Sequence, residues 1–203
     1  MKPTARKYNS PLRQSHAEDT RERILQATAE LLDANPHGDI SMDEIARSAG
    51  VERRTVFRHF SNREALFDAF WDYINSAMNV GFPETLDALL EAPKTTFSQF
   101  DQREGVIRAS LHTQSGHAMR LRSIPVRQAA FRRFLKAAFV DADPAEAAKA
   151  EAVLHLLYTA GAWEILRDYC GLDGEQAGEA VSWAMRAVLA AAKAKPNNSL
   201  KLQ

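Results

Sequence analysis

The chain contains a single cysteine, Cys170, among its 203 residues. One cysteine excludes an intrachain disulfide framework and a CxxC metal site, and it is typical of the reducing cytoplasm, where we expect this protein. Long apolar runs are also absent, since none approaches the roughly 18 residues of a membrane-spanning helix. The first residues are polar and basic and lack the apolar core of a secretory signal peptide. We therefore expect neither export nor a membrane partner.

An excess of either charge is missing too, because 26 Lys and Arg residues balance 26 Asp and Glu residues. Any nucleic-acid site must then be a local basic patch, since the chain as a whole does not attract a polyanion. The sequence also lacks a G-x-S-x-G turn, a Gly-rich phosphate loop and an H-E-x-x-H helix. His112 and His117 do not have the i,i+4 spacing of a helical metal pair. We predict no enzyme activity, no metal and no cofactor.

Two capping signals and a glycine turn are present close together in the N-terminal half. Ser41 and Glu44 have the spacing of a capping box, in which each side chain satisfies a free amide of the other residue. Gly50 supplies the backbone conformation of a sharp turn after this short helix. Ser61 and Glu64 repeat the capping box and predict the start of a third helix. Helix, tight turn and helix in this order predict a helix-turn-helix.

The second helix of this motif is basic. Residues 47–63 include five arginines and one acidic residue, Glu52. Arginine suits the DNA major groove because its planar fork matches O6 and N7 of guanine, while other donors fix register on phosphates. A merely solvated helix face would not place its arginines beside a turn and two capping boxes. The exposed sides of the predicted groove-reading helix carry Arg53, Arg54, Thr55, Arg58 and His59.

Over residues 20–70 the sequence resembles the tetracycline-repressor (TetR) family of regulators. Each motif alone is weak, but together they have the spacing of the family. The resemblance implies an all-α homodimer that binds a palindromic DNA operator and is released by a small-molecule effector. The motifs are Arg23-Ile24-Leu25, Ile45-Ala46, Ala49-Gly50-Val51, Phe57-Arg58-His59-Phe60 and Arg63-Glu64-Ala65-Leu66.

The resemblance also implies which side chains contact DNA. Phe57 stands where the family has a tyrosine, so one hydroxyl contact to phosphate is lost, at about 1 kcal/mol. Arg54 stands where the family often has a small residue, which predicts a different operator preference. The implied phosphate contacts are Ser41, Thr55, Phe57, His59 and Arg63, and the implied base contacts are Arg53, Arg54 and Arg58.

No segment has the period of a strand, so the predicted fold class is all-α. We expect a flexible basic arm over residues 1–17, a three-helix helix-turn-helix DNA-binding domain over 18–77, and a ligand-binding and dimerisation domain over 78–203. The helix that starts at Ser61 should bridge the two domains, and the first helix should begin near Asp19. The arm has two open interpretations, a solvated tail or an extension along DNA phosphates.

Glycine and proline set the expected helix ends in the second half of the chain. The expected helices are a short one around 86–90 that ends at Pro93, one over 103–113 that breaks at Gly116, a basic amphipathic one after Pro125, a long one from Pro144 to Cys170 that ends at Gly171, and a last one from about Asp173 to Lys195.

The closing helices have more apolar residues than one hairpin needs, which favours a four-helix bundle across a twofold axis and hence a homodimer. An intramolecular hairpin is the alternative. An effector pocket is expected between the middle helices, although aromatic residues at helical spacing are more often core and histidines are more often simply solvated. The candidate ligand-binding residues are Phe97, Phe100, Leu111, His112, Met119, Trp163 and Tyr169.

These observations predict a DNA-binding transcriptional regulator, namely a homodimeric repressor released by a small-molecule effector. The alternative is an all-α ligand-binding or interaction protein in which the helix-turn-helix is only an element of the fold. Salt-dependent binding to duplex DNA distinguishes the two.

Overall fold

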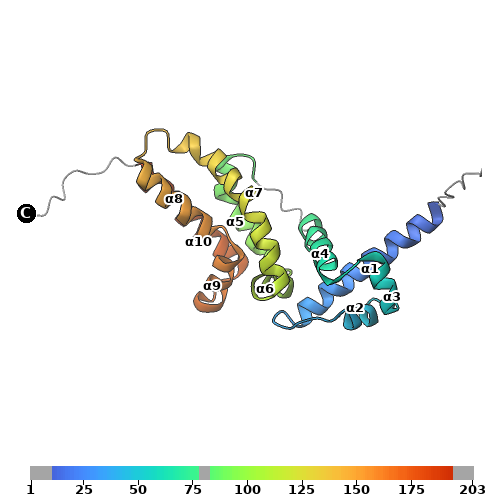
Figure 1. Ribbon diagram of the computed structural model, residues 1–203. Helices are drawn as coiled ribbons and strands as arrows, with labels where there is room; N and C mark the ends of the chain where they lie inside the picture. The colour runs from blue at the N-terminus through green and yellow to red at the C-terminus, as the bar shows by residue number, and fades with distance from the viewer. Residues whose placement is uncertain (1–10, 78–82, 194–203) are drawn as a thin grey trace, which may run out of the picture.

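The computed structural model of the protein describes residues 11–77 and 83–193. Over these two ranges the chain forms ten helices and no strand, which confirms the all-α prediction. None of the helices in these ranges is long and apolar enough to cross a membrane. The helices are α1 (Pro11–Ala34), α2 (Met42–Ser48), α3 (Arg53–His59), α4 (Arg63–Ala77), α5 (Leu86–Asp101), α6 (Glu104–His112), α7 (Gln114–Ala138), α8 (Pro144–Leu157), α9 (Ala160–Cys170) and α10 (Gly174–Lys193) (Figure 1).

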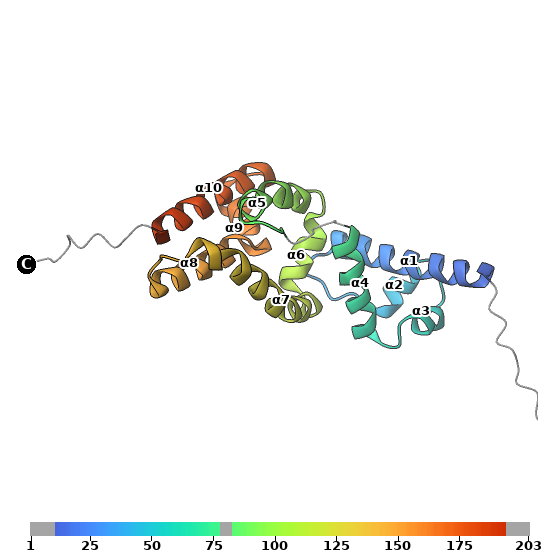
Figure 2. The same ribbon diagram turned by 90° about the horizontal axis from the view of Figure 1, so that it is seen from above.

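The helices gather into two lobes, α1–α4 and α5–α10 (Figure 1). Figure 2 shows α6 and α7 on the side of the second lobe that faces α1 and α4, and these are the helices in contact. Helices α6 and α7 therefore form the side of the second lobe that contacts the first lobe. The joining contacts are the Val106 amide on the Asp33 carboxylate (2.8 Å), the Arg122–Asp68 ion pair (2.5 Å) and the ring contact of His37 with His112 (centroids 4.8 Å apart).

Helix α1 begins earlier than the sequence predicted, at Pro11 instead of near Asp19. The hydroxyl of Thr20 donates to the carbonyl of His16 at 2.8 Å, so the chain before Asp19 is already helical. Residues 11–17 of the predicted flexible arm therefore belong to α1, and residues 1–10 lie outside the described residues.

Helix α4 does not begin with the predicted capping box of Ser61 and Glu64. Asn62 caps it, because its side-chain oxygen accepts from the Ala65 amide at 2.7 Å and its carbonyl accepts from the Leu66 amide at 3.2 Å. Asparagine ranks with serine among the preferred capping residues, so two neighbouring candidates competed for the same position.

Pro93 does not end a helix, since α5 continues through it to Asp101. A proline inside a helix removes one backbone hydrogen bond and costs about 3 kcal/mol. Tight packing offsets that cost: Pro93 is buried, and Gly178 of α10 lies so close that an added Cβ would be 2.6 Å from the Pro93 carbonyl oxygen. The α5–α10 contact therefore keeps the helix intact where a local rule would end it.

The predicted break at Gly116 and restart after Pro125 are also wrong, because α7 runs through both residues. The break lies at Thr113, whose hydroxyl caps α7 by accepting from the Gly116 amide at 3.1 Å. Nothing in the described residues accounts for Pro125, which is exposed within α7.

The single helix predicted from Pro144 to Cys170 is two helices that meet at Tyr158 and Thr159. The hydroxyl of Thr159 caps α9, and the carbonyl of Tyr158, at the break, accepts a hydrogen bond from Arg127 of α7. The predicted end at Gly171 is confirmed, with φ of 67°. The break separates α9 from α8 and lets α9 pack against α6 as well as α5 and α10.

Candidate nucleic-acid interface

Helices α2 and α3 form the helix-turn-helix, and hydrogen bonds fix the angle between them. The capping box of α2 is confirmed: the Ser41 hydroxyl accepts from the Glu44 amide at 3.2 Å, and the Glu44 carboxylate accepts from the Ser41 amide at 2.8 Å. The Ser41 hydroxyl also donates to the Glu44 carboxylate at 2.7 Å, and this bond, followed by that of the Ser41 amide, lowers the pKa of Glu44. Gly50 has φ of 64°, and the Val51 amide closes the turn on the Ala46 carbonyl at 3.0 Å. A rigid turn of this kind holds α3 in one orientation.

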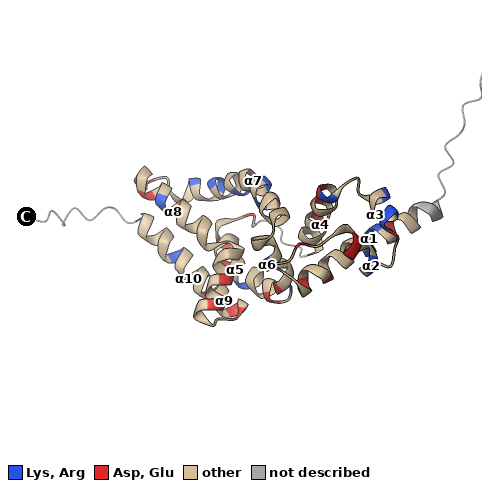
Figure 3. Cartoon of the chain, turned by 60° about the horizontal axis from the view of Figure 1, so that its bottom comes forward, with Lys and Arg blue, Asp and Glu red and all other residues tan. Residues whose placement is uncertain are grey.

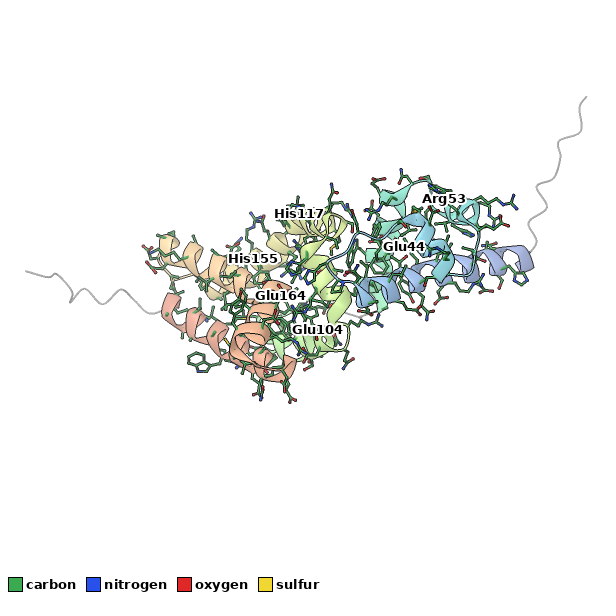
Figure 4. All side chains as sticks on the ribbon, turned by 90° about the horizontal axis from the view of Figure 1, so that it is seen from below. Glu44, Arg53, Glu104, His117, His155 and Glu164 are labelled. Carbon is green, nitrogen blue, oxygen red and sulfur yellow. The ribbon has the colours of Figure 1, made fainter. Side chains whose placement is uncertain are left out.

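Arg53 and Arg54 open α3 and point away from the second lobe, as Figure 4 shows for Arg53. Arg53 contacts the Asp43 carboxylate at 3.2 Å, and its side chain is 61% exposed. Arg54 contacts the carboxylate of Glu52 at 2.7 Å and is 85% exposed. Pairs this exposed contribute about 0–1 kcal/mol, so a phosphate or a base edge can displace the carboxylate at little cost.

Three more of the predicted contact residues follow on α3. Phe57 is 38% exposed and lies beneath Arg53, whose guanidinium carbon is 5.5 Å from the ring centroid. The ring therefore supports Arg53 through a cation–π contact. Thr55 is half-buried, with its amide on the Glu52 carbonyl at 2.8 Å. Arg58 is exposed and forms no ion pair within the described part of the chain.

His59 is half-buried at the end of α3. Its Nε2 atom is buried and has no hydrogen-bond partner within the described residues. Burial lowers the pKa of His59, and the positive charges of Arg58 and Arg21 lower it further. The free protein therefore favours a neutral imidazole here, next to a basic surface.

Arg63 begins α4 and reaches back towards the start of α2. It contacts the Asp39 carboxylate at 2.8 Å and the Ile40 carbonyl at 3.2 Å, and its guanidinium carbon lies 4.6 Å from the Phe67 ring centroid. With Arg53 it lines a hollow of about 350 Å³. Its lining residues are Asp39, Ile40, Ser41, Met42, Asp43, Arg53 and Arg63.

The structure thus brings Ser41, Arg53 and Arg63 to one hollow, although they come from different helix starts. Sequence reasoning missed the carboxylates that form ion pairs with the two arginines, namely Asp43 with Arg53 and Asp39 with Arg63. No short-range spacing signals these pairs, because the two partners of each pair are 10 and 24 positions apart in the sequence. Figure 3 shows the Lys and Arg positions of α3 in blue at one end of the molecule, well apart from the red Asp and Glu positions of α9.

The residues predicted to bind a ligand divide into a buried and an exposed group. Phe97, Phe100 and Trp163 lie together, with ring centroids 5.7 Å apart for the first two and 5.8 Å apart for the last two. The Trp163 indole donates to the Asp101 carboxylate at 2.8 Å. Tyr169 is 85% exposed and does not belong to this buried group. The three rings pack as core.

The other candidates are less enclosed. Leu111 and Met119 are half-buried, and His112 is exposed with Nε2 at 2.7 Å from the Glu164 carboxylate. Within the two described ranges, no three His, Cys, Asp or Glu side chains gather as they would around a metal ion. Of the seven candidates, three thus pack against one another as rings, two are half-buried and two, His112 and Tyr169, are exposed.

Comparison with known proteins gives one family model that matches within the first lobe, and relatives that match part of the chain. Residues 24–70 match the family model described as bacterial regulatory proteins, tetR family. The transcriptional regulator EthR of Mycobacterium tuberculosis is 34% identical over 89 residues, which are 43% of this chain and 39% of that protein. The regulator SrpR of Pseudomonas putida is 40% identical over 55 residues, 27% of this chain and 26% of that protein. The matches thus span less than half the length of these relatives.

Solved structures extend the likeness to both lobes. NalD, described as the secondary repressor of the MexAB-OprM multidrug efflux pump in Pseudomonas aeruginosa, aligns with a TM-score of 0.60 and 23% identity, over 84% of this chain and 96% of that one. A transcriptional regulator from Rhodococcus aligns with a TM-score of 0.58 and 20% identity, over 87% of this chain and 99% of that one. At these identities the likeness concerns the fold.

Proposed function

Because this chain belongs to the tetR family of bacterial regulatory proteins, we propose that it is a homodimeric DNA-binding transcriptional repressor released by a small-molecule effector. The observation that carries the proposal is the arrangement of α3. Arg53 and Arg54 stand exposed at its start, each on a single carboxylate that DNA can replace, behind a rigid capped turn. Paired recognition helices would then read two half-sites about 34–36 Å apart.

Exposed apolar side chains on the closing helices support the dimer. Leu154 and Met185 of the same helices are fully buried in the chain's own core, so the exposed ones are surplus to it. Large apolar side chains that gather on a surface mark an interaction site, and a twofold pairing would cover them in both copies. They are Val153, Leu156, Ile165, Tyr169 and Trp183.

The contacts between the lobes support release by an effector. A ligand that favours one arrangement of α6 or α7 would act on α1 through the Val106–Asp33 bond and on α4 through the Arg122–Asp68 pair. Repression is lost when the favoured state spaces the two recognition helices wrongly for the groove, and the coupling equals the ligand's differential affinity for the two states.

The test starts from an operator selected from random duplexes by the purified protein, with affinity then measured against salt. Arg53→Ala should relax base preference by about 1–3 kcal/mol, since it removes a forked contact. Arg63→Ala should weaken binding to every sequence and lower the salt slope by about one unit, since it removes a phosphate contact. Arg132→Ala, an exposed change on α7, is the control.

Absence of salt-dependent duplex binding would refute the DNA-binding proposal and leave the alternative of a ligand-binding protein. Equal losses for Arg53→Ala and Arg63→Ala, with base preference unchanged, would refute their separate roles. Trp183→Asp tests the dimer: its molar mass in solution should fall to that of one chain, and a wild-type protein that is already monomeric contradicts the proposal.

A further inference from the structure

A polar cluster lies in the second lobe, where α7 contacts α8 and where Thr96 of α5 meets Tyr158 at the end of α8. Arg127 of α7 donates to the carbonyl of Tyr158, and its guanidinium carbon lies 5.9 Å from the Tyr158 ring centroid. The Tyr158 hydroxyl is 3.1 Å from the hydroxyl of buried Thr96 on α5. His155 of α8, labelled in Figure 4, stacks on Phe131 with centroids 3.9 Å apart. Polar groups from three helices thus meet away from the DNA-binding lobe.

Arg127 is a half-buried cation that pairs with no carboxylate of the described residues. Removing a charge from water is costly unless an opposite charge replaces the solvent. Burial accordingly lowers the pKa of Arg127, and the nearby Tyr158 only partly opposes this effect. A neutral amide could have donated equally well to the Tyr158 carbonyl. The charge itself therefore needs an explanation.

His155 provides a second, independent observation in the same cluster. Its Nε2 atom is buried and makes no hydrogen bond within the described residues. Burial lowers the pKa of His155 first of all, and the positive charges of Arg127 and Arg132 lower it further, with Glu151 opposing. A neutral imidazole with a free nitrogen thus stands close to an uncompensated guanidinium.

Arg120, two turns before Arg127 on α7, is likewise a half-buried arginine that donates to a backbone carbonyl. Residues seven apart lie on the same face of a helix. One of its guanidinium nitrogens donates to the Leu111 carbonyl at 3.3 Å, and Nη1 is buried without a partner in the described part of the chain. Burial lowers its pKa as well. Two arginines of α7, Arg120 and Arg127, are therefore half-buried, whereas Arg122, Arg132 and Arg133 are exposed.

We propose that Arg127 and His155 are the anion-recognising end of the effector site, and that the effector is an organic acid whose carboxylate binds the fork of Arg127. This inference rests on the proposed release by a small molecule. Two parallel N–H···O bonds to a carboxylate are stronger than the single bond to a neutral carbonyl, and the Nε2–H tautomer of His155 can donate to the same anion. The stacked rings of Phe131 and His155 provide an apolar wall for the rest of the acid.

The site also has a route to the DNA-binding lobe. Arg127 now caps the end of α8 at the Tyr158 carbonyl, where α9 begins. A carboxylate that draws Arg127 away changes this junction, and α9 holds α6 through Arg108, which contacts Glu164 at 3.0 Å and Asp168 at 2.6 Å. Helix α6 in turn contacts α1.

Calorimetric titration of the full-length protein tests the inference with matched pairs of probes. Benzoate and octanoate are compared with benzamide and octanamide, which have similar size but no charge, and inorganic phosphate serves as a charge without an organic body. At least one of the two acids should bind, and at least tenfold more tightly than its amide and than phosphate. Arg127→Gln should weaken that binding at least tenfold, while Arg133→Gln, a change of the same kind at an exposed position of the same helix, should leave it unaltered.

Arg127→Lys keeps a charge and a donor for the Tyr158 carbonyl but loses the fork, so it should fold and still bind the acid at least threefold more weakly. It replaces Arg127→Gln if that variant does not fold. Binding of neither acid, equal binding of acid and amide, equal binding of phosphate, or unchanged affinity in the Arg127 variants would each overturn the inference. Operator binding by the wild-type protein is scored separately. Its absence defeats the proposed function, whereas its presence without acid binding defeats only this assignment.

Discussion

The two lobes use the same chemistry, arginine against a carboxylate and an aromatic ring, in opposite settings. In the first lobe Arg53 pairs with Asp43 alone among the described residues and lies over Phe57, and all three side chains are exposed. In the second lobe the side chain of Arg108 is 16% exposed, and its guanidinium carbon lies 5.5 Å from the centroid of the fully buried Trp163 ring. The comparison separates arginines that are free to exchange partners from arginines that are not.

The difference in solvent contact decides the energetics. An exposed pair is screened by water and contributes at most about 1 kcal/mol, so Arg53 can exchange Asp43 for another anion at little cost in free energy. A network that is shielded from water holds its members, because removing one leaves the others without compensation. Its bonds raise the pKa of Arg108 and lower that of Asp168. The network contacts are Arg108 with Glu104 (2.8 Å), Glu164 (3.0 Å) and Asp168 (2.6 Å), and Arg167 with Asp101 (3.0 Å) and Glu104 (2.9 Å).

The largest expected contrast concerns the two rings. Trp163→Ala should lower the free energy of unfolding by about 4 kcal/mol, because it leaves a cavity and frees the Asp101 carboxylate from the indole. Phe57→Ala should change it by about 0.5 kcal/mol or less, since the ring is on the surface. Urea unfolding of both variants measures the difference. Similar losses for the two would show that Phe57 is a core residue and that the comparison fails.

The arginines themselves should differ next. Arg108→Met should cost about 2 kcal/mol, less than for a fully buried pair because Asp168 is 40% exposed. Arg53→Met should cost no more than about 1 kcal/mol. Raising the salt concentration should shrink the effect of Arg53→Met and leave most of the effect of Arg108→Met, since the Arg53 side chain is 61% exposed to water and ions and the Arg108 side chain only 16%. A salt response of equal size at both sites would contradict the distinction.

Two glycines give a smaller and more symmetrical test. Gly50 and Gly171 have φ of 64° and 67°, and an added Cβ would meet nothing within 4 Å at either position. Alanine at each should therefore cost a similar amount, about 1 kcal/mol, through backbone strain alone. Only Gly50→Ala should also weaken operator binding, because it alone alters the turn before α3. Equal effects on DNA binding would mean that the turn does not set the angle of α3.

The first lobe was predictable because its signals are local. The Ser41–Glu44 box and the turn at Gly50 each depend on residues within a few positions of one another, and the structure confirms both. Where two local signals competed, as at Ser61 and Asn62, the prediction was one residue off. The exposed arginines of α3 were found from charge and spacing alone.

The second lobe was less predictable because tertiary contacts override its local signals. Pro93 reads as a helix end, yet its packing on α10 keeps α5 continuous. The Thr159 hydroxyl caps α9, but position 162 is an alanine and not the Glu or Gln of a capping box. The sequence therefore contains no clear signal of a helix start here, and the break between α8 and α9 was missed. The same limit applies to the site: Arg127 and Tyr158 are joined across helices, and no spacing in the sequence reports that contact.

The smallest expected effects are those of pH on the two half-buried histidines, one in each lobe. Burial lowers the pKa of both His59 and His155 from the ordinary 6.5, and neighbouring arginines add to the shift. Below pH 6.5 the unfolded chain binds protons that the folded chain does not, so stability is fully present above that pH and declines as the pH falls through the lower folded pKa. His59→Gln and His155→Gln should each flatten part of this decline in urea unfolding, and the exposed His117→Gln should not.

DNA phosphates beside His59 would favour its charged form, so operator binding should strengthen as the pH falls in the wild type and in His155→Gln but not in His59→Gln. If operator affinity rises equally in the wild type, His155→Gln and His59→Gln, then His59 does not face the DNA backbone, and the DNA-contacting part of α3 ends before it.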